Sequence, residues 1–238
     1  MEVGMMERLR GACKFLLFCL AFIGLFDTVE ARDFKNRQYA LISYTFSIHP
    51  DVRQKISPFD GLFPQNPEEY SRIDPVYFRL KGLCFDRLKM RFERELSLFI
   101  LPIRIYGKQY SYDSEGYPSM LIEVAQRRGN AKYYISLDVK ILTSPESSAA
   151  VSGEKYHDST LSPNEYLRPR VEITTTMYPR LGIVPTDRYV STMQWQTPIR
   201  LEPTLLDGII NSKRRRDRTT LLEVIEMAVE TVIEDIKK

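Results

Sequence analysis

The chain has 238 residues, of which 43% are hydrophobic and 27% are charged, a composition typical of a globular protein with one core. Its 34 basic and 31 acidic residues leave a formal net charge of only +3. This excess is too small and too dispersed for a nucleic-acid-binding protein, so we expect no nucleic-acid partner.

Residues 1–31 have the pattern of a secretory signal peptide. Three cations, Arg8, Arg10 and Lys14, precede an unbroken apolar run at 15–26, and the segment ends at the small residue Ala31. The run is short for a bilayer span, which takes roughly 20 residues, so cleavage before Arg32 is favoured over an uncleaved membrane anchor. The sequence therefore predicts an exported protein, with membrane anchoring by an uncleaved N-terminus as the alternative.

Cysteine and asparagine usage narrows the expected compartment. Removal of the signal peptide would leave Cys84 as the single cysteine, so the mature chain cannot form an internal disulfide. No asparagine begins an Asn-X-Ser/Thr glycosylation site. Exported eukaryotic proteins commonly contain disulfides and glycosylation sites. Because this chain offers neither, we expect the protein to be located in the bacterial periplasm.

The first elements of the mature chain are a strand and an irregular segment. Residues 39–48 (YALISYTFSI) alternate in polarity, which predicts a strand with Ile42, Tyr44, Phe46 and Ile48 on one face. Residues 58–75 are rich in Pro, Gly, Asn and Asp, which indicates irregular surface structure.

The stretch 83–97 fits two periods. Phe85, Leu88, Phe92 and Leu96 have helical spacing, whereas a second apolar set that includes Met90 and Leu98 has the period of two of a strand. We slightly favour the strand and leave the helix open. Residues 98–106 (LFILPIRIY) predict a strand, with Pro102 marking an edge or a bulge.

Gly129-Asn130 is a strong turn signal between two apolar-alternating segments. With these residues at the centre of a hairpin turn, the register pairs Val124 with Ile135, Ile122 with Leu137 and Met120 with Val139. One face of the hairpin is then apolar, which predicts an antiparallel sheet with one solvated face.

The rest of the chain contains a loop, two strands and a basic run. Residues 143–168 are serine-rich without apolar periodicity, which indicates a mobile loop or a functional flap. Residues 170–178 and 188–196 alternate like strands, and residues 203–210 fit a short helix broken at Asp207-Gly208. A basic run at 213–218 leads into the last element.

The clearest element is a helix at 219–236. Its apolar residues form one broad stripe, and Thr219 or Thr220 is placed to cap its start. Such a stripe must be covered by an apolar surface. We therefore predict a single α+β domain at 32–238, in which this amphipathic helix covers one face of an antiparallel sheet of about five to seven strands.

Motifs for catalysis or metal binding are missing. The mature chain has two histidines, His49 and His157, and contains no HExxH, CxxC, GxSxG, Walker-type or GxGxxG pattern. Residues 113–116 have two of the carboxylates of a calcium loop but lack its remaining ligands. The sequence thus favours a non-enzymatic protein without a metal or cofactor, and leaves the enzyme question open.

Two surface features suggest contact with a ligand or partner. Tyr110, Tyr112 and Tyr117 lie in an aromatic loop suited to sugars or peptides, although tyrosines that merely cover a sheet edge would give the same pattern. Arg214, Arg215 and Arg216 suit anionic headgroups or an acidic partner, although a solvated linker would have the same composition.

These features favour an exported, non-enzymatic bacterial envelope protein that binds an envelope component or a partner protein, with peripheral membrane contact through the basic run. One alternative is an exported hydrolase that gathers Cys84, a histidine and a carboxylate such as Glu123. The other is a structural subunit that docks through the edge near Pro102 or through the stripe of the last helix. The sequence leaves the ligand and the oligomeric state undetermined.

Overall fold

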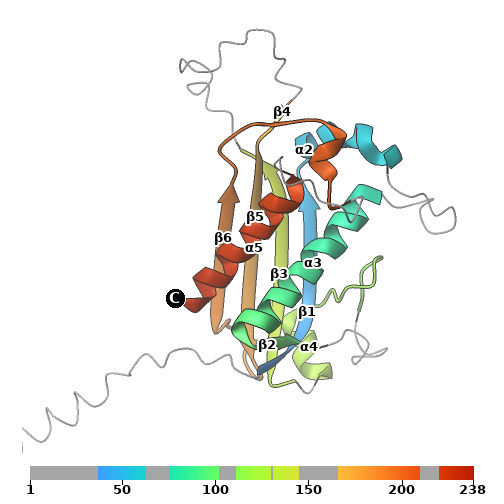
Figure 1. Ribbon diagram of the computed structural model, residues 1–238. Coiled ribbons are helices and arrows are strands. Elements are labelled where there is room, and N and C mark those ends of the chain that lie inside the picture. Colours follow the sequence, from blue (N-terminus) through green and yellow to red (C-terminus); the bar gives the residue numbers. More distant parts are fainter. Residues whose placement is uncertain (1–36, 63–74, 102–110, 130, 145–165, 210–219) are drawn as a thin grey trace, which may run out of the picture. The chain divides into compact units, whose positions relative to one another are not determined.

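A computed structural model describes residues 37–62, 75–101, 111–129, 131–144, 166–209 and 220–238 (Figure 1). Five strands form one sheet in the order β2-β1-β3-β5-β6. Their bounds are β1 Arg37–Ile48, β2 Leu98–Ile100, β3 Tyr133–Thr143, β5 Pro169–Pro179 and β6 Asp187–Gln194. The strands predicted at 39–48, 98–106, 170–178 and 188–196 are therefore present, although residues 102–106 lie outside the described part.

The sheet is mixed, and the prediction of a purely antiparallel sheet is wrong. β1 pairs with both β2 and β3 in parallel, whereas β3–β5 and β5–β6 are antiparallel. A parallel pair needs a long crossover connection. The chain between Ile48 and Tyr133 supplies one that contains several helices, so the α+β class is confirmed with a different strand arrangement.

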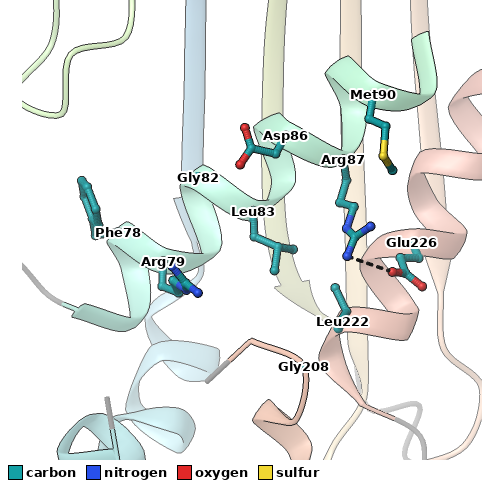
Figure 2. A pocket seen from close by; sticks show the side chains of 10 residues that line it. All are labelled: Phe78, Arg79, Gly82, Leu83, Asp86, Arg87, Met90, Gly208, Leu222 and Glu226. Atoms are coloured by element: carbon teal, nitrogen blue, oxygen red, sulfur yellow. Dashed lines mark ion pairs between the residues drawn. The ribbon is translucent and has the colours of Figure 1, made fainter. Parts of the chain in front are cut away.

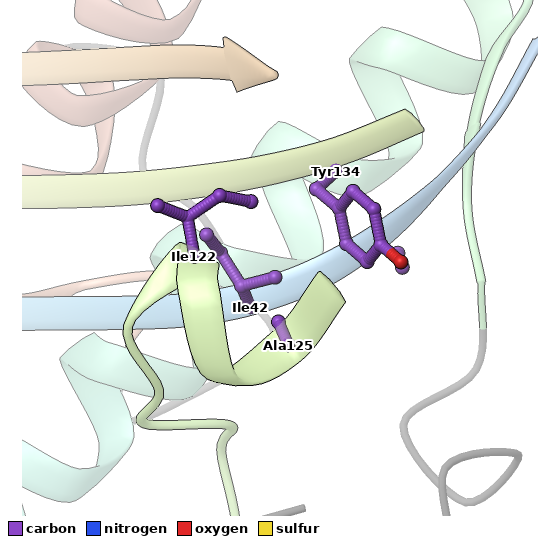
Figure 3. Close-up of a cluster of buried hydrophobic side chains, with 5 residues drawn as sticks. Ile42, Ile122, Ala125 and Tyr134 are labelled. Atoms are coloured by element: carbon purple, nitrogen blue, oxygen red, sulfur yellow. The ribbon is translucent and has the colours of Figure 1, made fainter. Parts of the chain in front are cut away.

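The predicted hairpin around Gly129-Asn130 is also wrong. Residues Ile122–Arg128 form the short helix α4, and β3 pairs with β5 and β1 instead of with residues 120–125. Ile122 and Ala125 are three residues apart, a spacing that places both on one side of a helix. They pack with Ile42 and Tyr134 against the sheet, as Figure 3 shows.

A bulge in β1 changes which face Ile42 occupies. The register with β3 shifts between Leu41 and Ser43, so Tyr44 aligns with Leu137 and lies on the same face as Leu41. Ile42 turns to the opposite face, where it joins the cluster under α4. Its predicted place beside Tyr44, Phe46 and Ile48 is therefore corrected.

The stretch 83–97 is helical, contrary to the strand that the sequence slightly favoured. Helix α3 spans Pro75–Leu96 and packs against β1, β2 and the last helix. Its buried side chains recur every three or four residues, among them Leu80, Cys84, Leu88 and Phe92. Because the charged residues between them also alternate, the local sequence satisfied both periods.

The last helix is confirmed as α5, Leu221–Lys237. Thr220 forms a capping box with Glu223, in which each side chain accepts a hydrogen bond from the other residue's backbone N–H. Nine residues of the apolar stripe are buried, and α5 packs on β5, β6 and α3. Burial of the stripe in this layer leaves it unable to dock another chain while the fold is intact.

Smaller elements complete the described fold. The helix α2 (Pro50–Ile56) and the 3-10 helix η1 (Ser57–Leu62) follow β1, and the 3-10 turn η4 (Pro203–Leu206) lies within the predicted 203–210 helix. A separate two-stranded sheet pairs β4 (Tyr166–Leu167) with β7 (Ile199–Arg200). Most of the predicted loop 143–168, the basic run, Pro102 and the predicted signal peptide lie outside the described residues.

Candidate functional site

The tyrosines predicted to contact a ligand have different environments. Tyr110 lies outside the described residues, and Tyr112 is 37% exposed. Tyr117 packs edge-on against Tyr44 and Phe85, with ring centroids 4.9 and 5.2 Å apart. The Tyr117 ring is therefore used largely for packing inside the fold. The other predicted contact residues, Arg214, Arg215 and Arg216, lie outside the described part.

A buried lysine explains the two carboxylates near Tyr117. Lys81 Nζ donates to Asp113 Oδ2 and to Glu115 Oε2, both at 2.6 Å, and its side chain is 4% exposed. The ammonium also lies 5.0 Å from the centroid of the Tyr117 ring. Burial alone lowers the pKa of Lys81, but the two carboxylate hydrogen bonds outweigh it and raise the pKa above its ordinary value.

The Lys81 cluster fastens the 111–120 segment to α3, and sequence reasoning missed it. The sequence contained two separate signals for this cluster: a cation, Lys81, within the apolar stripe of α3, and two carboxylates, Asp113 and Glu115, in a Gly-containing turn. Because both carboxylates already bind the ammonium, the cluster is a structural clamp.

Within the described part of the chain, the residues of the hydrolase alternative are not brought together. Cys84 is buried in α3, on the sheet face where Phe85 contacts Tyr44 at 5.1 Å. Glu123 belongs to α4, which covers the other face (Figure 3). His49 caps α2, where its Nδ1 accepts a hydrogen bond from Asp51 N, and His157 lies outside the described residues. Burial raises the pKa of the Cys84 thiol far above its usual range, which suppresses the thiolate.

A groove of about 580 Å³ lies between α3 and α5 (Figure 2). Its α3 side carries Phe78, Arg79, Gly82, Leu83, Asp86, Arg87 and Met90. Leu222 and Glu226 of α5 and Gly208 of the η4 turn form the opposite side. The groove therefore combines exposed apolar side chains with charges of both signs.

Local backbone geometry closes one end of this groove. Gly208 has a φ of 81°, and a β-carbon at this position would lie 2.5 Å from Leu222 Cδ2. The glycine thus lets the η4 turn approach α5. Arg79 extends from α3 toward the same turn and donates from Nε to Ile209 O at 3.3 Å.

A second hollow of about 300 Å³ continues the groove along the helices. Its α3 wall carries Arg87, Arg91 and Arg94, and its α5 wall carries Glu223, Glu226 and Glu230. Two ion pairs cross between the walls: Arg87–Glu226 at 3.7 Å, drawn in Figure 2, and Arg91–Glu230 at 3.5 Å. Met90 and Met227 also line this part, and each is about two-fifths exposed.

The described residues contain no group of three His, Cys, Asp or Glu side chains arranged to hold a metal ion. Within the same residues, no helix is both long and apolar enough to cross a membrane.

No protein-family model and no curated protein matches the chain. Among solved structures, the hypothetical protein CT253 from Chlamydia trachomatis is similar over 84% of this chain and 96% of its own, with 8% identity and a TM-score of 0.41. The PelC dodecamer of Paraburkholderia phytofirmans is similar over 87% and 91%, with 11% identity and a TM-score of 0.34. A neuraminyllactose-binding hemagglutinin homologue from Helicobacter pylori covers 89% and 87%, with 10% identity and a TM-score of 0.31. These similarities are too distant to indicate a function.

Proposed function

We propose that this chain is an exported, non-enzymatic protein of the bacterial envelope that binds a partner protein in the groove between α3 and α5. The observation that carries the proposal is the composition of the rim. Phe78 and Met90 are 37% and 41% exposed beside Arg79 and Arg87. Aromatic residues, methionine and arginine are the residue types enriched in protein interfaces.

The charge pattern of the groove favours a protein over an anionic polymer. Arginines line the α3 wall and glutamates line the α5 wall. A uniformly anionic glycan or lipid headgroup would be repelled by Glu223, Glu226 and Glu230 along the whole second half. A peptide segment with charges of both signs can match both walls.

The shape of the groove agrees with this choice. The two hollows share Arg87, Met90 and Glu226, so they adjoin each other along the helix pair. A groove between two helices suits a helical or extended segment that lays an apolar side against Met90 and Phe78.

The export part of the proposal rests on the N-terminal pattern and on cysteine usage. A basic start, an apolar run and Ala31 have the order of a signal peptide, and Cys84 would be the single cysteine after cleavage. Expression in a bacterial host followed by fractionation and intact-mass measurement tests this part. A periplasmic species that begins at Arg32 supports it, and a full-length species in the cytoplasm contradicts it.

The binding part is tested by photo-crosslinking in cells. A photoreactive phenylalanine analogue replaces Met90 in the groove, and the control replaces Thr192, which is exposed on β6 on the far face of the sheet. We expect one discrete protein adduct from position 90 and none from position 192. Equal adducts from both positions, or none from position 90 in a correctly exported protein, contradict groove binding.

Charge exchange adds a test of specificity. Arg87→Glu places two carboxylates together, whereas the pair Arg87→Glu/Glu226→Arg restores an ion pair with the signs of the walls reversed. We expect both variants to lose the adduct at position 90. The double variant should have the same midpoint of urea unfolding as the wild-type protein. An undiminished adduct in the double variant means that the partner does not recognise the charges.

A second candidate function, a subunit of an envelope assembly, is favoured by the outer edge of β6. Within the described residues this eight-residue strand pairs only with β5. An unpaired strand edge can accept a strand from another chain. Light scattering over a range of protein concentrations tests this candidate, since a subunit gains mass as concentration rises.

A further inference from the structure

The turn between β5 and β6, residues 180–186, exposes three large apolar side chains. Leu181 is 80%, Ile183 57% and Val184 74% accessible to solvent. All three lie within four residues at the tip of the hairpin. Contiguous exposed patches of this kind mark interaction sites more often than scattered single residues do.

Hydrogen bonds on both sides hold this turn in place. Gln126 of α4 donates from Nε2 to Pro179 O at 3.1 Å and to Gly182 O at 3.0 Å. Thr186 N donates to Met177 O at 2.9 Å, which closes the hairpin. Gly182 adopts a φ of 97°, which other residues rarely adopt. The backbone is therefore fixed in a form that presents the apolar side chains outward.

Five cations lie on the segments that border the apolar tip. Arg180 lies in the turn, Arg127 and Arg128 end α4 beside it, Arg188 lies near the start of β6, and Lys132 precedes β3; all five are exposed. Asp187 is the acidic residue nearest in sequence and is half-buried. An apolar tip within a basic collar matches the two layers of an anionic bilayer surface, with acyl chains beneath phosphate headgroups.

The chain enters the domain at this same end of the sheet. Tyr39 aligns with Tyr133, and Tyr133 aligns with Pro179, so the start of β1 and the β5–β6 turn lie at the same end of the sheet (lower end of Figure 1). Residues 1–36 precede β1 and include the apolar run at 15–26. The chain therefore joins this N-terminal segment to the end of the sheet that carries the turn.

We infer that the 180–186 turn is a membrane-contacting surface, in which Leu181, Ile183 and Val184 enter the interface of an anionic phospholipid bilayer and the surrounding arginines contact its headgroups. The inference is independent of the groove between α3 and α5, which lies between two helices on one face of the sheet.

A tryptophan placed in the turn tests the inference in the full-length chain. Trp195 is the single native tryptophan. Trp195→Phe therefore removes the native tryptophan fluorescence, and Ile183→Trp then supplies the only tryptophan signal. The protein is mixed with vesicles of phosphatidylethanolamine and phosphatidylglycerol that contain brominated acyl chains. We expect a blue shift and strong quenching of the tryptophan at 183. The same readout with Thr192→Trp, farther along the hairpin, should change little.

The comparison of positions 183 and 192 isolates insertion of the turn itself. Because both positions belong to one protein, binding through residues 1–36 does not mimic it. Equal quenching at 183 and 192, or no change at 183 when the protein floats with the vesicles, overturns the inference. A blue shift at 183 that grows with protein concentration without vesicles also overturns it, because a second copy then covers the tip.

A matched pair of variants tests how much the 180–186 turn contributes to vesicle binding. Leu181→Ser/Val184→Ser should lower vesicle binding at least tenfold, whereas Val190→Ser, which removes an exposed valine from β6, should leave it unchanged. Equal loss in both variants overturns a specific role of the turn. Replacing phosphatidylglycerol by phosphatidylcholine should weaken binding, and unchanged binding overturns the role of the arginines.

Discussion

Lys81 Nζ lies 2.6 Å from Asp113 Oδ2, at a position where the lysine side chain is almost completely covered. The ammonium is also bonded to Glu115, and the Lys81 carbonyl accepts a hydrogen bond from the Tyr44 phenol at 2.7 Å. One residue of α3 thereby connects the helix to β1 and to the 111–120 segment.

Replacing Lys81 by methionine should destabilise the protein strongly, because it leaves two carboxylates in a partly buried site without their cation. We expect a loss of about 3 kcal/mol in the free energy of unfolding. Urea unfolding followed by circular dichroism measures it. Lys89→Met is the matched control, because Lys89 makes a half-exposed pair with Glu93 and its replacement should cost less than about 1 kcal/mol. Equal effects of the two substitutions would show that the Lys81 cluster contributes little.

Ser191→Ala should weaken the attachment of α5 to β6 in a pH-dependent way. Ser191 Oγ donates to Asp235 Oδ2 at 2.6 Å, and this hydrogen bond lowers the pKa of Asp235 below its ordinary value of 3.8. A carboxyl with a lowered folded-state pKa stabilises the fold above its ordinary pKa, and this contribution is lost as the pH falls through the folded-state pKa.

We therefore expect Ser191→Ala to cost about 1 kcal/mol near neutral pH, since Asp235 is partly screened by solvent. The difference from wild type should shrink in acid. Unfolding curves at neutral and acid pH measure this, with Ser47→Ala on the exposed face as the control. A penalty that is constant across pH would mean that the Asp235 charge is not involved.

Cys84 should react with thiol reagents only after unfolding, because it is buried and its pKa is raised by burial. The measurement uses Cys13→Ser/Cys19→Ser, which leaves Cys84 as the sole thiol. We expect labelling to be fast in denaturant and at least a hundredfold slower in the native protein. Fast labelling of the native protein would show that the Cys84 thiol is accessible and would support the hydrolase hypothesis.

Ile122→Ala should show that α4 is part of the core. Ile122 is 8% exposed in the cluster with Ile42 and Tyr134, so we expect a loss of about 3 kcal/mol. The adjacent Leu121 is 71% exposed, and Leu121→Ala should change the free energy of unfolding by less than about 0.5 kcal/mol. Similar losses from both substitutions would mean that α4 does not pack as described.

Where the apolar residues of a segment fit only one spacing, helical or strand-like, prediction and structure agree. The stripe of α5 has the helical period alone and begins after a capping threonine, and strands β5 and β6 have uninterrupted alternation. These patterns are local, since side chains a few residues apart determine them. The groove between α3 and α5 and the clamp at Lys81 were not predictable in this way, because each joins residues far apart in sequence.

The sequence by itself therefore determined the α+β class, the terminal helix with its buried stripe and the four long strands β1, β3, β5 and β6. Tertiary structure decided between two periods in α3, replaced the 129–130 hairpin by α4, and placed β1 parallel to β3. In each case the local pattern alone did not select the observed structure. The pairing of β3 with two distant strands, and the packing of α3 against β1 and α5, selected one of them by burying apolar surface that no local alternative could cover.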